Sequence, residues 1–243
     1  MTKTPWIRLR LLLSEEEMGT IRHARVAVFG LGGIGGQAAE ALVRSGIGAI
    51  DLIDNDDVDP TNMNRQILAT HSSIGRLKVD VAEERFTDIN PDLIVRKYPT
   101  FYLPEQESDF DFIQYDYVVD CIDTVTAKLS LIEKAKREGC PVISSMGTGN
   151  RFDPSKLLIT DISKTHGDPL AKVMRRELKK RGICSCKVLF STEEPHTPDP
   201  VLEEEIVKGS NRRSIPGSTP FVPPAAGLLI ASEVIRDLIM KKV

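Results

Sequence analysis

Short apolar runs alternate with amphipathic segments along the first 150 residues of this chain. The apolar runs are rich in Val and Ile and predict strands at 25–29, 49–53, 93–96, 117–121 and 141–145. Between them, helical patterns lie at 37–44, 77–90 and 126–138. In the second of these, Val79, Ala82, Phe86 and Ile89 recur at steps of 3, 4 and 3. The alternation predicts an α/β fold with a doubly wound, mostly parallel sheet and helices on both faces. We expect the runs at 93–96, 117–121 and 141–145 to be buried.

The last hundred residues are less regular and form a C-terminal extension of this pattern. A strand at 157–160, a basic helix at 170–181 and a strand at 187–191 are expected there. The segment 195–224 holds seven of the fifteen prolines, which predicts a long mobile loop. A terminal helix at 225–241 follows it. We therefore expect a single domain over residues 1–243, with a nucleotide-binding core at 20–150 and a C-terminal part at 151–243.

Composition excludes several classes of protein. A hydrophobic content of 41% is enough for a buried core, and a net charge of −3 provides no overall positive field for nucleic acid. The four cysteines form no CxxC pair, which excludes a Cys₄ zinc site of that spacing and favours a reducing cytosol. No apolar run approaches the ~20 residues of a membrane span. We expect a soluble cytoplasmic protein with no membrane partner.

The clearest motif is the glycine-rich turn at 30–35, GLGGIG, between the first strand and the first helix. Gly30, Gly32 and Gly33 allow a tight turn and let a phosphate approach the N-terminus of the helix. Asp54 ends the second strand, where an acid can bind ribose hydroxyls. The turn predicts a Rossmann-like nucleotide site, for which NAD is the usual ligand.

Two cations after the second strand favour nucleotidyl transfer over hydride transfer. Arg65 and Lys78 follow an acidic turn that contains Asp56, and they suit the charge that develops on phosphates. Lys78 lies one position off the apolar stripe, so its side chain is expected to point outward. Asp120 lies near the end of the strand at 117–121, and Asp123 follows that strand. Asp120 is expected to be a buried structural acid and Asp123 a ligand of Mg²⁺.

Four segments in one order resemble the adenylating domain of the ubiquitin-activating-enzyme superfamily of ThiF/MoeB type. They are GLGGIG at 30–35, DNDDVDPTNMNRQ at 54–66, GRLK at 75–78 and DCID at 120–123. The resemblance implies that Arg65, Lys78 and Asp123 are the catalytic residues, with Asp123 on Mg²⁺. The residues that it implies for ATP are Gly30, Gly32, Gly33, Asp54, Asp56, Asn64, Arg65, Gln66, Lys78 and Asp123.

Within that superfamily the chain resembles the tRNA threonylcarbamoyladenosine dehydratases nearly end to end. The matching segments include RLRLLL at 8–13, ALVRSGIG at 41–48, DPLA at 168–171 and FSTE at 190–193. The resemblance implies ATP-dependent cyclisation of a threonylcarbamoyl group on a tRNA adenosine beside the anticodon. An acyl-adenylate forms first, and ring closure then releases AMP. Because closure is intramolecular, effective molarity can lower the barrier by ~7–11 kcal/mol without a strong enzymic nucleophile.

The same resemblance implies partners. These are tRNA bearing threonylcarbamoyladenosine, a second copy of the chain, and a cysteine desulfurase or sulfur acceptor. Arg8, or failing that Arg10, is the residue expected to enter the neighbouring ATP site. Six basic residues between 172 and 181 predict a tRNA-binding helix face, to which Arg212 and Arg213 could add.

Two alternatives stay open at this point. One is an adenylyltransferase for a ubiquitin-like sulfur-carrier protein, in which Cys184 or Cys186 would carry a thioester or persulfide. Against it, no base or environment that would lower a thiol pKa is evident around these cysteines. The other alternative is an NAD-binding or non-catalytic Rossmann protein.

Overall fold

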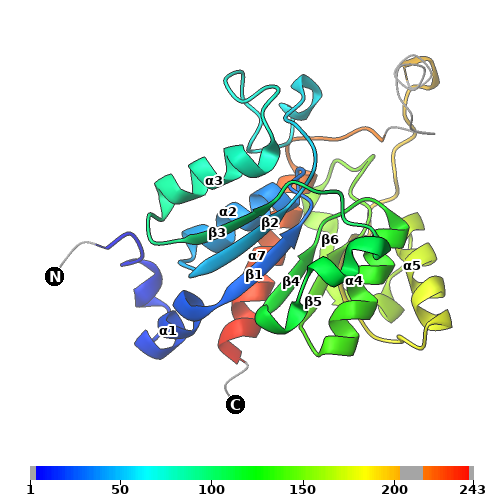
Figure 1. Cartoon of the computed structure of the whole chain (residues 1–243). Coiled ribbons are helices and arrows are strands. Elements are labelled where there is room, and N and C mark those ends of the chain that lie inside the picture. The colour runs from blue at the N-terminus through cyan, green and yellow to red at the C-terminus, as the bar shows by residue number, and fades with distance from the viewer. Residues whose placement is uncertain (1–3, 203–215, 241–243) are drawn as a thin grey trace.

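A seven-stranded sheet forms the centre of the computed structural model, which describes residues 4–202 and 216–240 (Figure 1). The strand order is β3-β2-β1-β4-β5-β7-β6, and only β6 runs antiparallel to its neighbour among these strands. The strands are β1 (Arg25–Phe29), β2 (Ala49–Ile53), β3 (Ile94–Tyr98), β4 (Tyr117–Asp120), β5 (Val142–Ser145), β6 (Leu157–Asp161) and β7 (Lys187–Ser191). The expected doubly wound, mostly parallel sheet is confirmed, and strands from the C-terminal part join it.

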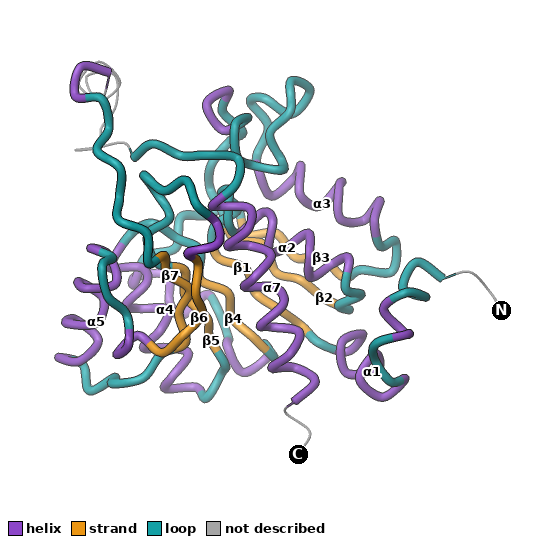
Figure 2. The backbone as a smooth tube through the Cα atoms, turned by 180° about the vertical axis from the view of Figure 1, so that it is seen from behind, coloured by secondary structure: helices purple, strands orange, loops and turns teal. Residues whose placement is uncertain are grey.

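Helices cover both faces of the sheet. They are α1 (Glu15–His23), α2 (Gly35–Arg44), α3 (Lys78–Ile89), α4 (Val125–Glu138), α5 (Pro169–Lys180) and α7 (Val222–Met240). Apolar side chains of α1, α2, α3 and α7 share one core cluster, and those of α4 and α5 share the other. Figure 2, seen from behind, shows α7 lying across the sheet on the first of these faces. Short 3₁₀ helices connect the elements, at Leu9–Leu11, Pro60–Asn62, Pro104–Asp109, Phe112–Gln114, Pro154–Lys156 and Ile162–Lys164.

The central strands are apolar on both faces because both faces are covered. Along β1, Val26 and Val28 point into one cluster, while Ala27 and Phe29 point into the other. This pattern of continuous burial is what a parallel sheet between two helical layers requires. It explains why the sequence shows apolar runs here and not strict alternation.

The run at 93–96 was expected to be a buried strand, and this expectation is wrong. The corresponding strand, β3, is the edge of the sheet beside β2, and Ile94, Arg96 and Lys97 are exposed. Charged side chains on an edge strand discourage pairing with another chain. The charged Arg96 and Lys97 distinguish β3 from its more apolar neighbours, but its place at the edge of the sheet is given only by the strand order.

Helix α1 is an element that the apolar pattern did not predict. Its signal is the capping box Ser14-x-x-Glu17, in which the Ser14 hydroxyl accepts the N–H of Glu17 at 3.2 Å. The Glu17 carboxylate in turn accepts the N–H of Ser14 at 2.7 Å. Ser or Thr followed by Glu at the third residue is a recognisable helix start.

The last helix, α7, begins at Val222, inside the segment expected to be a loop. It packs closely on α2, because a Cβ on Gly227 would lie only 2.4 Å from the carbonyl oxygen of Ile34. The part of the expected mobile loop at 203–215, with Arg212 and Arg213, lies outside the described residues. Among the helices described at 4–202 and 216–240, none has the length and apolar character needed to cross a bilayer.

Candidate active site

The carboxyl ends of β2, β1 and β4 lie side by side and form the base of the candidate site. From β1 the chain winds outward to β2 and β3 on one side, and to β4 and β5 on the other. Such a switch in winding direction opens a crevice at the carboxyl ends of the strands, where ligands of open α/β sheets bind. Gly30, Asp54 and Asp123 follow these three strands.

The glycine turn after β1 meets two different steric demands. A Cβ on Gly30, whose φ is +89°, would lie 2.8 Å from the Cys121 carbonyl oxygen, so the chain itself requires glycine there. At Gly32, by contrast, no atom of the described residues lies within 4 Å of an added Cβ. The open space beside Gly32 and the N-terminus of α2 leaves room for a phosphate.

Asp54 connects the end of β2 to this turn. Its carboxylate accepts the N–H of Leu31 at 2.6 Å and that of Asp56 at 2.8 Å. Burial raises the pKa of Asp54, and the charge of Lys78, 3.9 Å away, opposes that rise. In this arrangement Asp54 holds the turn in place.

Lys78 does not point outward as the apolar stripe suggested, so that expectation is wrong. Its side chain is 5% exposed, and its ammonium lies 2.8 Å from the Asp56 carboxylate. Lys78 is the first residue of α3, where the side chain can fold back over the helix N-terminus toward Asp54 and Asp56. The charge is therefore directed at the acidic turn beside the carboxyl end of β2.

Arg65 lies beside the glycine turn, since its carbonyl oxygen is 3.2 Å from the position of a Cβ on Gly33. The Arg65 guanidinium donates to the carbonyl of Thr61 and to the side chain of Asn64, both at 2.9 Å. Asn64 also donates to the carbonyl of Ser218 at 3.0 Å. Gln66 is buried, and its side-chain oxygen has no hydrogen-bond partner among the described residues.

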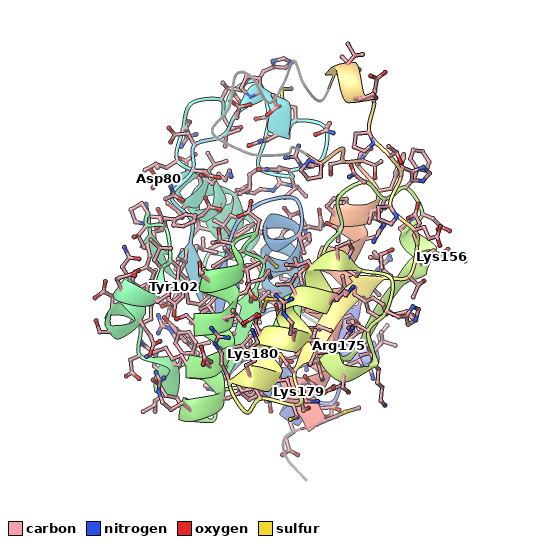
Figure 3. All side chains as sticks on the ribbon, turned by 90° about the vertical axis from the view of Figure 1, so that its right-hand side faces the viewer. Asp80, Tyr102, Lys156, Arg175, Lys179 and Lys180 are labelled. Atoms are coloured by element: carbon pink, nitrogen blue, oxygen red, sulfur yellow. The ribbon has the colours of Figure 1, made fainter. Side chains whose placement is uncertain are left out.

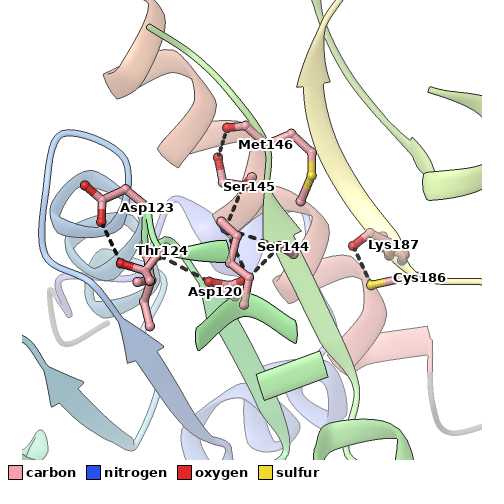
Figure 4. A network of polar contacts seen from close by, with 10 residues as sticks. Asp120, Asp123, Thr124, Ser144, Ser145, Met146, Cys186 and Lys187 are labelled. Carbon is pink, nitrogen blue, oxygen red and sulfur yellow. Dashed lines mark hydrogen bonds and ion pairs between the residues drawn. The ribbon is translucent and has the colours of Figure 1, made fainter. Parts of the chain in front are cut away.

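The two acids at the carboxyl end of β4, Asp120 and Asp123, have different surroundings (Figure 4). Asp120 is fully buried and accepts from the Ser144 hydroxyl at 2.5 Å and from the Lys128 ammonium at 3.1 Å, as expected of a structural acid. Asp123 is exposed at the edge of the site and accepts from the Thr124 hydroxyl at 3.4 Å. Only Asp123 has the access that a metal ligand needs.

The two cysteines considered for covalent chemistry also differ. Cys186 is buried, and burial raises the pKa of its thiol to about 12. Cys184 is exposed. A thiol with so high a pKa is a poor nucleophile, so Cys186 does not suit the role of a thioester or persulfide carrier.

A cavity of about 220 Å³ lies beside Asn64 and was not predicted from the sequence. Three stretches of chain form its wall, at 150–152, 196–198 and 217–219. Ser218, which accepts from Asn64, belongs to this wall. Contacts between residues so far apart in the chain leave no local signal.

The basic residues of α5 lie on the surface, as Figure 3 shows for Arg175, Lys179 and Lys180. Arg175 is partly buried because it donates to the Thr165 carbonyl at 2.7 Å. Arg176 and Lys180 both contact Glu177, and hydrogen bonds from Lys180 and Arg176 lower the pKa of that carboxyl to about 2. The face is basic, but its charge is partly neutralised from within the helix.

A model of the ThiF family matches residues 6–242, almost the whole chain. The chain belongs to the ThiF family. A ThiF relative from Bacillus subtilis, a tRNA threonylcarbamoyladenosine dehydratase, is 43% identical over 241 residues, which cover 96% of this chain and 93% of that protein. The Haemophilus influenzae protein of the same name is 37% identical over 95% of this chain and 92% of its own. The resemblance to these dehydratases is therefore confirmed.

A solved ThiF structure agrees with the sequence relatives. The Escherichia coli tRNA N6-threonylcarbamoyladenosine dehydratase TcdA, in complex with ATP, superimposes with a TM-score of 0.86 at 33% identity, covering 99% of this chain and 98% of that one. The same protein was also solved in complex with AMP, with the same TM-score. By contrast, the adenylyltransferase and sulfurtransferase UBA4 of Vanderwaltozyma polyspora is 36% identical over only 58% of this chain.

Proposed function

We propose that this chain is an ATP-dependent dehydratase that cyclises the threonylcarbamoyl group of a tRNA adenosine. The observation that carries the proposal is 43% identity with a dehydratase of that name across 96% of the chain. In the reaction, a carboxylate oxygen attacks the α-phosphorus of ATP and pyrophosphate leaves. The neighbouring carbamoyl group then attacks the activated carbonyl carbon, and AMP leaves with the former carboxylate oxygen.

The residues at the carboxyl ends of β1, β2 and β4 fit the binding of ATP. The glycine turn, with Gly30, Gly32 and Gly33, lies at the N-terminus of α2, where peptide N–H groups bind phosphate. Arg65 and Lys78 place two cations beside it, which stabilise the charge that builds on the phosphates during transfer. The residues that we assign to ATP are these five with Asp54, Asp56, Asn64, Gln66 and Asp123.

Asp123 fits a role in holding Mg²⁺ together with the nucleotide. No group of three or more His, Cys, Asp or Glu side chains that could hold a metal occurs within 4–202 and 216–240. Mg²⁺ is usually held by one or two carboxylates, substrate phosphates and water, so a single exposed carboxylate is sufficient. When bound, the ion supplies further positive charge at the phosphates.

A nucleoside assay tests the function directly. Transfer RNA bearing threonylcarbamoyladenosine is incubated with the protein, ATP and Mg²⁺. The RNA is then digested, and the masses of its nucleosides are measured by mass spectrometry. We expect the modified nucleoside to lose the mass of one water, with AMP and pyrophosphate released. An unchanged nucleoside, together with pyrophosphate exchange that responds to a Gly-Gly-tailed carrier protein, would favour the adenylyltransferase instead. The shorter match to UBA4 argues against that outcome.

We also propose that two copies of the chain associate. Exposed apolar side chains occur on β6 and α7: Leu158 and Leu229 line a groove between the two elements, and Leu228 is exposed on α7. Near the N-terminus, Leu11 and Leu12 are each 82% exposed next to the exposed Arg8. Contiguous exposed apolar surface is typical of protein interfaces, and a copy bound there could bring Arg8 to the neighbouring site. A cytoplasmic location and a sulfur-acceptor partner remain predictions.

A further inference from the structure

The cavity beside the proposed ATP site is lined by an arginine whose charge is poorly satisfied. Arg151 is 3% exposed, and its Nε and Nη1 have no hydrogen-bond partner among the described residues. A guanidinium has donors on all three of its nitrogens and keeps its charge at any physiological pH. Burying such a group without acceptors is costly unless a ligand supplies them.

Asp168, a carboxylate that interacts electrostatically with Arg151, does not supply the missing acceptors. The two side chains attract electrostatically, but no hydrogen bond or ion pair joins them within the described part of the chain. One Asp168 oxygen is occupied in capping α5, where it accepts the N–H of Ala171 at 2.9 Å. Burial raises the pKa of the Asp168 carboxyl, which reduces its value as a counter-ion at acidic pH. Arg151 therefore remains available for an anion in the cavity.

The wall of the cavity is built through Asn150, which is held in a left-handed conformation with φ 58°. The Asn150 N–H donates to the Gly217 carbonyl at 2.8 Å, and its side-chain oxygen accepts the N–H of Gly217 at 2.6 Å. The Asn150 carbonyl accepts the N–H of His196 at 2.8 Å. Asn150 thus joins all three stretches of the wall by hydrogen bonds within the chain.

An aromatic surface lies at the same place. Phe152 is 60% exposed, lines the cavity and contacts Phe221 edge to face, with the ring centroids 5.6 Å apart. Single-stranded RNA bases commonly stack on such exposed aromatic rings. The link from Ser218 to Asn64, the neighbour of Arg65, connects this surface to the proposed phosphate site.

We propose that this cavity binds the carboxylate-bearing side group of the modified adenosine. Arg151 binds the carboxylate that is to be activated, and Phe152 stacks on the base. About 220 Å³ is less than the ~300–1,000 Å³ typical of sites for drug-sized ligands, which suits a small side group better than a whole nucleoside. This inference rests on the proposed function and extends it by naming the residues that bind the acceptor.

The test compares two anticodon stem-loop RNAs, one with the threonylcarbamoyl group and one with plain adenosine. Equilibrium binding is measured for the wild-type protein, Arg151→Gln and Phe152→Ala. A hydrogen bond to a charged group contributes ~1.5–3 kcal/mol, so we expect the wild type to prefer the modified RNA by about 10- to 100-fold. Arg151→Gln should lose that preference, whereas Phe152→Ala should weaken binding of both RNAs. ATP affinity should stay unchanged in both variants.

Arg85→Gln is the control, because it removes a partly buried arginine that is paired with Glu40 away from the cavity. It should keep the preference for the modified RNA. If Arg151→Gln is too unstable to assay, an RNA whose carboxylate is a methyl ester serves in its place. The wild type should bind that ester no better than plain adenosine.

Two results would overturn the inference. One is an unchanged preference in Arg151→Gln or for the ester. The other is equal weakening of both RNAs by Arg151→Gln, because the arginine would then bind a backbone phosphate. A wild type that prefers the carboxylate RNA but does not cyclise it with ATP would instead refute the proposed function and leave this site standing.

Discussion

Lys78 and Asp56 form an ion pair at the start of α3, in which the carboxylate balances the charge of the lysine. A phosphate that enters between Gly32 and α3 would compete with Asp56 for this ammonium. We infer that Lys78 exchanges one anion for another and needs no large movement to do so.

The first prediction concerns the two cations. Lys78→Ala and Arg65→Ala should each lower kcat by ~10²–10³-fold, the usual loss when a donor to developing charge is removed. Turnover of modified tRNA at saturating ATP is the measurement, with thermal melting to establish that the variants fold. Arg76→Ala is the control, since Arg76 lies two residues from Lys78 but pairs with Glu84 on the surface. Near-normal turnover in both site variants would refute the assignment.

The second prediction concerns the thiols. At pH 8, iodoacetamide should modify the exposed Cys184 first and leave Cys186 intact, because burial both blocks access and raises the Cys186 pKa to about 12. Labelling of Cys186 should therefore rise with pH across the whole range below 12. Peptide mass spectrometry after timed labelling measures both sites. Cys184→Ser should retain dehydratase activity; loss of turnover would revive a covalent role.

For single residues, the sequence predicted which side chains form the site but not how all of them are oriented. The glycine turn and Asp54 carry strong local signals, and the structure places them together at the ends of β1 and β2. Lys78 was misplaced because its orientation depends on acids about twenty residues earlier in the chain. Arg151 was missed because its place in the cavity wall depends on the contacts of its neighbour Asn150 with Gly217 and His196.

Among the helices and strands, some follow from neighbouring residues in the sequence, and others depend on which strands lie side by side in the sheet. The strands at 25–29 and 49–53 were predicted to the residue, because central parallel strands are mostly apolar; Arg25 and the buried Asp51 are the exceptions. The exposure of β3 follows from the strand order alone. Helix α1 could have been found from Ser14 and Glu17, whose spacing is a local signal.

The third prediction belongs to α5. Lys172 and Lys179 are exposed and form no ion pair among the described residues, so they are better placed for RNA than Arg175. Lys172→Glu with Lys179→Glu should weaken tRNA binding and make its salt dependence shallower, by ~0.7–0.9 in log–log slope for each phosphate that the protein no longer neutralises. Filter binding across a salt series measures both effects.

A charge-matched variant, Arg22→Glu with Arg96→Glu, is the control for this experiment. These residues lie on α1 and on β3 at the opposite edge of the sheet from β6. The control should bind tRNA nearly as the wild type does. If the α5 variant and the control have the same salt slope, α5 is not the RNA surface.

For the whole molecule, the fourth prediction is a dimer. Light scattering at micromolar concentration should give twice the 26.9 kDa mass of the chain. Leu158→Glu with Leu228→Glu places charges on the exposed apolar surface of β6 and α7 and should shift the protein to monomer. A wild-type monomer with full activity would refute the proposal, including any part for Arg8 in a neighbouring site.

The packing of α7 on α2 has a consequence for synthesis of the protein. The glycine turn is translated early, but its neighbours include Pro223, whose Cβ lies 3.0 Å from the position of a Cβ on Gly33. Gly227 also packs against Ile34 at the start of α2. Without α7, the apolar side chains of α2 would therefore be exposed to solvent. A nascent chain on the ribosome therefore leaves the apolar side of α2 uncovered until residues 222–240 have been translated. A message truncated before codon 222 should yield a target for proteolysis and not a partial enzyme.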